Sequence, residues 1–271
     1  MFKKVVIITV IILSIFSMNI QGQILVKSKL TQKYQLNPGS ISEGKIIVKS
    51  NLNHKTIVKL YMKDYSFDYD GNNYYSKAGS NPRSNSEWIY LSKKKIELKP
   101  LEEREVKYMI KVPDNKNYSG TYWSMIMVEE DSIVSYNDKN NFKSSVGFKQ
   151  NIRYGIQIIT NFSSNKKINL KYKDVEIIKK DTNTYIFELA VLNNNNYLID
   201  SNTKIILINR DTGNIKDQYL SKNRNLYPET SIKIKKEFNL KENIPYKIVA
   251  ITGNEKHGYH GKEYSVEVEN N

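Results

Sequence analysis

The stretch from Ser144 to Thr160, SSVGFKQNIRYGIQIIT, alternates apolar and polar side chains over most of its length. Because successive side chains of an extended strand point to opposite faces, the alternation predicts a strand with one apolar face. At about 17 residues, this strand would exceed the roughly 3 to 10 residues usual in globular proteins. The apolar face would carry Val146, Phe148, Gln150, Ile152, Tyr154, Ile156 and Ile158, and the opposite face Lys149, Asn151, Arg153 and Gln157.

Two interpretations of this long strand are open. Its second half could pair within its own sheet while its first half offers an unpaired edge and apolar side chains to another protein. Alternatively, the strand is simply the last one of a sandwich and is followed by a linker.

Almost every other segment also indicates strand, with alternating β-branched and aromatic residues between clusters of turn residues. About seven to nine short strands precede residue 150, which is typical of an immunoglobulin-like sandwich. After a polar stretch at residues 161–167, about seven more strands follow. The sequence therefore predicts an all-β chain of two tandem immunoglobulin-like β-sandwiches, residues 23–160 and 161–271.

Residues 1–22 have the pattern of a secretory signal peptide. Two lysines precede an apolar run from Val5 to Phe16, and small or polar residues then lead to Gly22. The run is shorter than the roughly 20 residues that a membrane span requires. We expect cleavage before Gln23 and release into the periplasm; the alternative is an uncleaved N-terminal anchor. With no cysteine, sheets and core rather than disulfides must hold such a secreted chain together.

The net charge of +14 comes from lysines distributed along the predicted strands, between Ile, Val and Tyr. That distribution indicates solvated sheet faces rather than a nucleic-acid surface, which would gather the positive charge on one patch.

Motifs for chemistry are weak, and we predict neither an enzyme nor a cofactor or metal site. The sequence has no nucleophile elbow, phosphate-binding glycine loop or zinc-protease motif. His257 and His260 lie in a glycine-containing segment that favours a polar loop over a metal site. The run DYDGNN at residues 68–73 has its glycine at the fourth place rather than the sixth, which favours a turn over a calcium loop. Trp88 and Trp123 are expected to pack in the core.

The order of these features resembles that of the periplasmic pilus-assembly chaperones, the two-domain PapD class. The resemblance is spread over nearly the whole mature chain. It rests on an early L-x-P-G turn (Leu36, Pro38, Gly39), a Trp88 segment, G-x-Y-W (Gly120, Tyr122, Trp123), an L-x-N segment at Leu192, a D-x-G turn (Asp211, Gly213), Tyr227-Pro228 and P-Y-K-I at residues 245–248.

The resemblance implies a set of binding residues. In that family, the closing strand of the first domain donates alternate hydrophobic side chains to an incomplete subunit, and basic residues anchor the carboxylate of the subunit. Val146 and Phe148 would then be donor residues, with Ile152 at the base of the run. Arg153 would be the anchor, and Lys33 is a weaker second candidate. The alternatives are an exposed strand arginine and a solvated lysine.

The function implied is a periplasmic chaperone that binds and stabilises pilin-like or surface-fibre subunits by donor-strand complementation. An outer-membrane usher is a further expected partner, and the chain could also self-associate through the exposed strand edge. The alternative is a structural or adhesive cell-surface protein built of the same modules.

Overall fold

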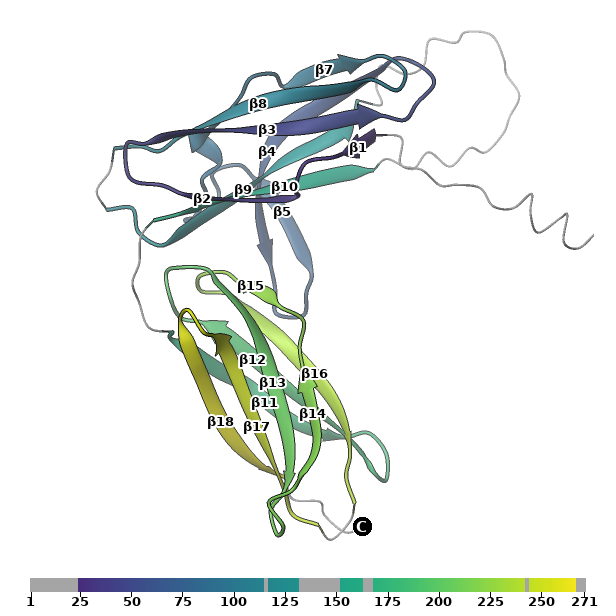
Figure 1. The fold of residues 1–271 in the computed structure, drawn as a ribbon, viewed down its shortest axis with the longest axis vertical. Helices are drawn as coiled ribbons and strands as arrows, with labels where there is room; N and C mark the ends of the chain where they lie inside the picture. The colour runs from purple at the N-terminus through teal and green to yellow at the C-terminus, as the bar shows by residue number, and fades with distance from the viewer. Residues whose placement is uncertain (1–23, 115–116, 132–151, 163–167, 242–243, 267–271) are drawn as a thin grey trace, which may run out of the picture.

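The computed structural model describes residues 24–114, 117–131, 152–162, 168–241 and 244–266 (Figure 1). These residues form two β-sandwiches that meet at an angle, each with its own apolar core. The predicted all-β chain of two tandem sandwiches is confirmed. The predicted signal peptide lies outside the described residues. Within the part of the chain that is described, no helix has the length and apolar character needed to cross a membrane.

The first sandwich packs a four-stranded sheet against a six-stranded sheet. The four-stranded sheet has the order β1 (Ile24–Val26), β3 (Ile41–Ser50), β8 (Glu103–Lys111), β6 (Ile89–Leu91). The six-stranded sheet has the order β2 (Thr31–Gln35), β10 (Arg153–Asn161), β9 (Thr121–Glu130), β4 (Thr56–Phe67), β5 (Asn73–Lys77), with β7 (Lys95–Leu98) also on β4. A short 3-10 helix, Ser86–Trp88, precedes β6.

The core of this sandwich follows from strand alternation. Val48, Leu60, Ile110, Ile126 and Ile158 are at most 1% exposed, and they come from five different strands. Their neighbours in sequence point to the outer faces, as the two-residue period requires. The long apolar side chains of both sheets therefore fill one interior.

The second sandwich is built in the same way. Its sheets have the orders β11 (Leu170–Lys179), β12 (Thr184–Asn193), β16 (Ser231–Asn239) and β14 (Ile215–Leu220), β13 (Ile199–Asn209), β17 (Tyr246–Asn254), β18 (Gly258–Val266), with β15 (Arg224–Leu226) also on β13. Phe187, Leu189, Ile205 and Leu207 are central in its core.

The N-terminal segment contributes one strand to each sheet of the first sandwich. β1 pairs with β3 in the four-stranded sheet, and after residues 27–30 the chain continues as β2 in the other sheet. β2 lies parallel to β10. Because the chain must first cross between the sheets, β2 begins only at Thr31 and covers only part of β10.

An aromatic seam joins the two sandwiches. Trp123, Ile159 and Tyr227 are buried there together, at 3%, 0% and 3% exposure, and Phe67 packs on them from the end of β4. The Trp123 indole Nε1 donates a hydrogen bond to the Tyr65 carbonyl oxygen at 2.8 Å. Trp123 was expected to pack in a core, and it packs between the domains instead.

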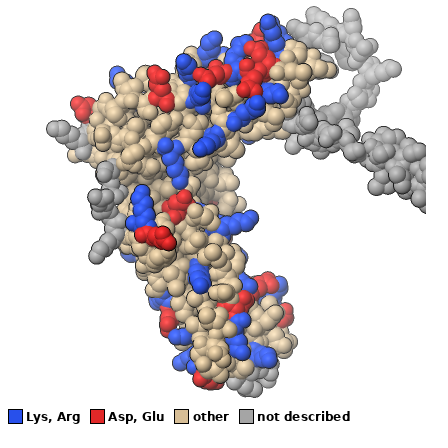
Figure 2. All heavy atoms as spheres, viewed as in Figure 1, with Lys and Arg blue, Asp and Glu red and all other residues tan. Residues whose placement is uncertain are grey.

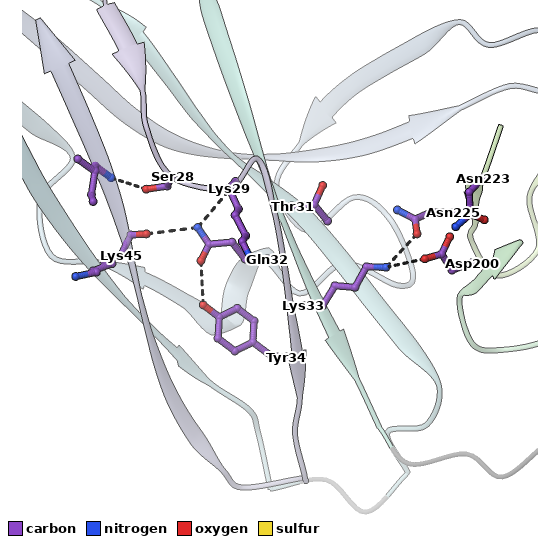
Figure 3. Close-up of a pocket in the computed structure, with 11 residues that line it drawn as sticks. Ser28, Lys29, Thr31, Gln32, Lys33, Tyr34, Lys45, Asp200, Asn223 and Asn225 are labelled. Carbon is purple, nitrogen blue, oxygen red and sulfur yellow. Dashed lines mark hydrogen bonds and ion pairs between the residues drawn. The ribbon is translucent and has the colours of Figure 1, made fainter. Parts of the chain in front are cut away.

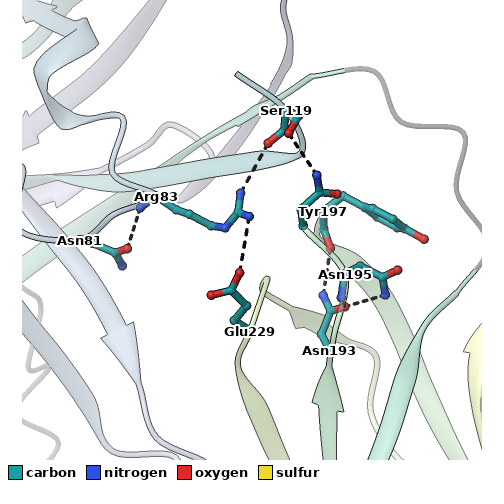
Figure 4. Close-up of polar contacts among 8 residues, drawn as sticks. Asn81, Arg83, Ser119, Asn193, Asn195, Tyr197 and Glu229 are labelled. Carbon is teal, nitrogen blue, oxygen red and sulfur yellow. Dashed lines mark hydrogen bonds and ion pairs between the residues drawn. The ribbon is translucent and has the colours of Figure 1, made fainter. Parts of the chain in front are cut away.

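Backbone hydrogen bonds fix the seam at its edge. The Thr121 amide donates to the Asn196 carbonyl oxygen at 2.8 Å, and the Leu198 amide donates to Thr121 Oγ1 at 2.8 Å. Arg83 lies between the Ser119 carbonyl oxygen and the Glu229 carboxylate (Figure 4). Hydrophobic burial and backbone pairing therefore hold the two domains together at the same place.

Gly120 tests how closely the backbones approach at this seam. Its φ of +76° favours glycine, and a Cβ at this position would overlap the Asn196 carbonyl oxygen. Gly213, with φ of +70°, has open space around it and is a matched control. The Gly213→Ala variant should have a free energy of unfolding about 1 to 2 kcal/mol below that of the wild type, because of backbone strain alone. The Gly120→Ala variant should lose roughly 1 to 3 kcal/mol more of the free energy of unfolding, because the added Cβ overpacks the seam. Denaturant unfolding of both variants measures the difference, and equal losses would contradict a close approach.

Candidate functional site

The edge of β10 is covered over only half of its length. On one side, all nine residues pair with β9, from Arg153 opposite Glu129 to Asn161 opposite Thr121. On the other side, β2 pairs only with the last five residues, Gln157–Asn161. Among the described residues, Arg153 to Ile156 therefore have a partner strand on one side only.

The backbone donors on this open edge can be identified. The Gln157 amide donates to the Leu30 carbonyl oxygen at 2.8 Å, so it points to the side of β2. Backbone groups of alternate residues in a strand point to the same side. The amides of Gly155 and Arg153 therefore point to the open side, where carbonyl oxygens of a further strand could accept hydrogen bonds from them.

Side chains of β10 alternate as predicted. Ile156 and Ile158 are fully buried in the first core, and Tyr154 packs against that core. On the other face, Arg153 is exposed, whereas Ile159 is buried by the second domain. Ile152 is partly exposed just before the strand begins. Val146 and Phe148, the predicted donor residues, lie outside the described residues.

Two methionine side chains pack beside Gly155 on the outer face of β10. A Cβ there would lie 2.8 Å from the Met125 Sδ atom and 3.6 Å from the Met127 Sδ atom, so the two methionine side chains occupy the space beside the glycine. Thioethers are polarisable and adapt their rotamers readily. The outer face of the open half of β10 is therefore packed against two buried, adaptable methionine side chains.

Arg153 forms an ion pair on the neighbouring strand. Its Nε atom lies 2.6 Å from the Glu129 Oε2 atom, and its side chain is 55% exposed. Burial, followed by the neighbouring Glu129 carboxylate, raises the pKa of Tyr61 on β4. The predicted anchor is thus already paired within the first domain.

Lys33 lies in a cleft between the two domains (Figure 3). Its Nζ atom donates to the Asn225 Oδ1 atom at 3.1 Å and lies 3.8 Å from the Asp200 Oδ2 atom. The cleft has a volume of about 810 Å³ and is also lined by Lys29 and Lys45. Lys33, predicted as the weaker candidate, therefore lies in a cleft that two further lysines also line.

The structure does not bring Arg153 and Lys33 together. Lys33 pairs with Ile159, six residues beyond Arg153 along β10. At about 3.3 Å per residue, that separation is roughly 20 Å along the strand. The two residues therefore belong to different ends of one surface, and a single small group could not contact both.

A partly buried polar cluster fastens β2 beside the cleft. The Tyr34 and Tyr108 hydroxyl oxygens are 2.7 Å apart, and the Tyr108 hydroxyl donates to the Gln32 Oε1 atom at 2.7 Å. A Cβ at Gly44 would overlap both tyrosines, so only glycine leaves room for them. Burial raises the pKa of Tyr108, which keeps the hydroxyl protonated as a donor.

Asn85 holds β10 from the interior of the first sandwich. Its Nδ2 atom donates to the Ile158 carbonyl oxygen at 3.1 Å, and the Ser124 hydroxyl donates to its Oδ1 atom at 2.5 Å. Asn85 and Ser124 are fully buried, so their polar groups depend on these partners. The covered half of β10 is therefore locked in place from two sides.

Sequence reasoning missed the partners of Lys33 in the second domain, Asp200 and Asn225. Nothing in the local pattern at these positions marks a site, because their role depends on how the domains meet. Gln157, only 7% exposed, was visible as a polar residue in an apolar strand, but its position beside β2 was not.

The two histidines of the β17–β18 region contact tyrosine rings, His260 edge-to-face and His257 at a tilt. The His257 ring lies 5.2 Å from that of Tyr197, and the His260 ring lies 4.6 Å from that of Tyr172. Burial lowers the pKa of His260. The described part of the chain holds no group of three or more His, Asp or Glu side chains arranged for a metal ion.

Comparison with known proteins gives similarity to solved structures only. No protein-family model matches the sequence, and no curated protein does. The class 5 fimbrial chaperone CfaA is similar over 89% of this chain and 98% of its own, with 15% identity and a TM-score of 0.48. A chain in a chaperone–tip adhesin complex of CFA/I fimbriae is similar over 89% and 97%, with 14% identity and a TM-score of 0.47. The Escherichia coli chaperone DraB is similar over 90% and 96%, with 13% identity and a TM-score of 0.40.

The turn between β4 and β5 lies against the second domain, where the Lys233 amide donates to the Tyr69 carbonyl oxygen at 3.1 Å. Within the turn, Asp68 accepts hydrogen bonds from the Asn72 amide at 2.9 Å and from the Asn72 Nδ2 atom and the Tyr74 hydroxyl, both at 2.8 Å. The predicted turn is confirmed. These bonds, chiefly the one from the Asn72 side chain, lower the pKa of Asp68 from 3.8 to about 2.

The lowered pKa predicts how the turn responds to acid. Asp68 stabilises the turn fully above its ordinary pKa of 3.8, and this contribution is lost as the pH falls through about 2. An NMR titration of the Asn72 amide should therefore have its midpoint near 2, and Asp68→Asn should abolish the transition. A midpoint near 4 would show that the carboxylate is not held by these bonds.

Proposed function

We propose that this protein is a periplasmic chaperone that binds surface-fibre subunits by donating a strand to them. The observation that carries the proposal is the half-covered β10. Its second half is paired on both sides, whereas Arg153 to Ile156 keep one edge open at the point where residues 144–152 lead into the strand.

An open edge of this kind suits a client that lacks a strand. Such a client exposes an apolar groove and unpaired backbone groups, and both favour aggregation. A strand added beside it satisfies the backbone groups, and alternate side chains of that strand fill the groove. Binding of this kind requires neither catalysis nor ATP.

We assign the donor side chains to Val146 and Phe148, with Ile152 at the base of the run. In an extended strand they would share the face of Ile156 and Ile158, because all five positions are separated by even numbers of residues.

The proposed client is a pilin-like subunit that crosses the periplasm before assembly, and an outer-membrane usher would receive it. The N-terminal segment supports this location through its pattern of a secretory signal. The same class of client, a tip adhesin, is named for one of the similar solved structures.

Gly155 allows a direct test of strand donation. Its amide points to the open edge, so Gly155→Pro removes one donor there without breaking a hydrogen bond to β9. Gly155→Ala adds the same Cβ but keeps the amide, and is the matched control. Compared with Gly155→Ala, Gly155→Pro should reduce capture of a co-expressed fibre subunit at least about threefold, the equivalent of one hydrogen bond. Pull-down from periplasmic extracts measures capture, and equal capture by the two folded variants would contradict pairing at this edge.

Charge reversal separates the two candidate anchors. If a residue holds the carboxylate of the client, replacing its positive charge with a negative one should reduce subunit recovery roughly tenfold or more, because a charged hydrogen bond is replaced by repulsion. We therefore compare Arg153→Glu with Lys33→Glu in the same recovery assay, with thermal unfolding as the control for folding. Unchanged recovery with either variant removes the anchor role from that residue.

A further inference from the structure

The partners of Lys33 come from two adjacent strands of the second domain. Asp200 on β13 and Asn225 on β15 are directly opposite each other in the antiparallel register. Opposite residues project to the same face of a sheet. One carboxylate and one side-chain amide are therefore presented side by side to the Lys33 ammonium group (Figure 3).

Together, these two side chains present the same chemical groups as a peptide C-terminus, a carboxylate and an amide carbonyl. The last residue of any chain carries an α-carboxylate, and the amide carbonyl of the preceding peptide bond lies next to it. Asp200 provides the carboxylate, and the Asn225 Oδ1 atom provides the amide oxygen. A lysine ammonium has three donors, so it can bind both kinds of oxygen at once.

The contact is open enough to be exchanged. The Lys33 and Asp200 side chains are 41% and 49% exposed, and their oxygen and nitrogen atoms are 3.8 Å apart. Both residues also line a second cavity of about 430 Å³ that opens from the same place. An incoming group therefore has space to reach the ammonium group without unfolding either domain.

The charges around the cleft favour an anion. Lys29, Lys33 and Lys45 line it, with Asp200 as the acidic side chain among its lining residues. Lys45 is paired with Glu105 at 2.9 Å, on the outer face of the four-stranded sheet. Lys29 is exposed at the rim, where it can attract a carboxylate over the range that salt screening permits.

We propose that Asp200 and Asn225 are an internal substitute for the C-terminus of the client. In the free protein, Asp200 and Asn225 contact the Lys33 ammonium group. A client binds by exchange, in which its terminal carboxylate replaces the Asp200 carboxylate at that ammonium group. This inference rests on the proposed function, because it assigns the client anchor to Lys33. It adds that the second domain competes with the client, so that a carboxylate alone binds weakly and clients with further contacts are preferred.

The test uses a minimal C-terminus, N-acetyl-trialanine with a free carboxylate, and its C-terminal amide as the neutral comparison. NMR titration of the wild-type protein follows the Lys33 ammonium signal and the backbone amides of β2 and β15. Asp200→Asn should bind the carboxylate peptide about two- to fivefold more tightly than the wild type, the range that an exposed ion pair provides. Neither protein should bind the amide peptide measurably.

Two control variants make the result specific. Asp211→Asn removes the same charge from an exposed turn of the second domain, outside the cleft, and should bind the peptide as the wild type does. Lys33→Ala should abolish binding with or without the Asp200 change. Thermal unfolding of each variant confirms that it is folded.

The outcomes distinguish this inference from the proposed function. If Lys33→Ala abolishes binding but Asp200→Asn binds no more tightly than Asp211→Asn, the substitute role is wrong and the anchor remains. If Lys33→Ala binds the peptide as well as the wild type does, the anchor at Lys33 and the exchange are both wrong. Strand donation, tested separately at Gly155, would be unaffected.

Discussion

The crossing of the N-terminal segment between two sheets determines how much of β10 can be covered. β1 belongs to one sheet and β2 to the other, and the residues between them must span the sandwich. β2 therefore starts late and pairs with only five of the nine residues of β10. The open edge and the position of Lys33 in the cleft both follow from this single crossing. A longer β2 would close the edge, since it would extend beside Gly155.

The junction between the domains fixes the position of the second domain beside the covered half of β10. Trp123 and Tyr227 have ring centroids 4.7 Å apart, and backbone hydrogen bonds run directly from one domain to the other. The seam is apolar at its centre and polar where it meets the cleft at Lys33. Figure 2 shows Lys and Arg side chains on both sandwiches with Asp and Glu among them, so the general surface has mixed charge. The cleft differs from that surface because its lysines outnumber its acidic residues.

Much of the fold could be predicted from the sequence because strand alternation is a local property. Ile156 and Ile158 were placed on the apolar face, and the structure buries both completely. Interactions between domains were not predictable in the same way. Ile159 lies on the face of β10 opposite Ile156 and Ile158, yet the second domain buries it. Lys33 meets Asn225 across 192 residues of sequence, and no local pattern reports such a contact. Alternation within one strand does not show which part of its outer face another domain covers.

The long strand β4 has a consequence for how the chain can be divided. Val58 and Leu60 at its start belong to the first core, whereas Phe67 at its end packs against the second core and the seam. One strand thus contributes to both hydrophobic cores. Unfolding of either sandwich would therefore expose apolar side chains of the other. Cutting the chain at residues 163–167 would not yield two independent modules. The N-terminal fragment would expose the aromatic side chains of the seam. The intact protein should unfold as one cooperative unit.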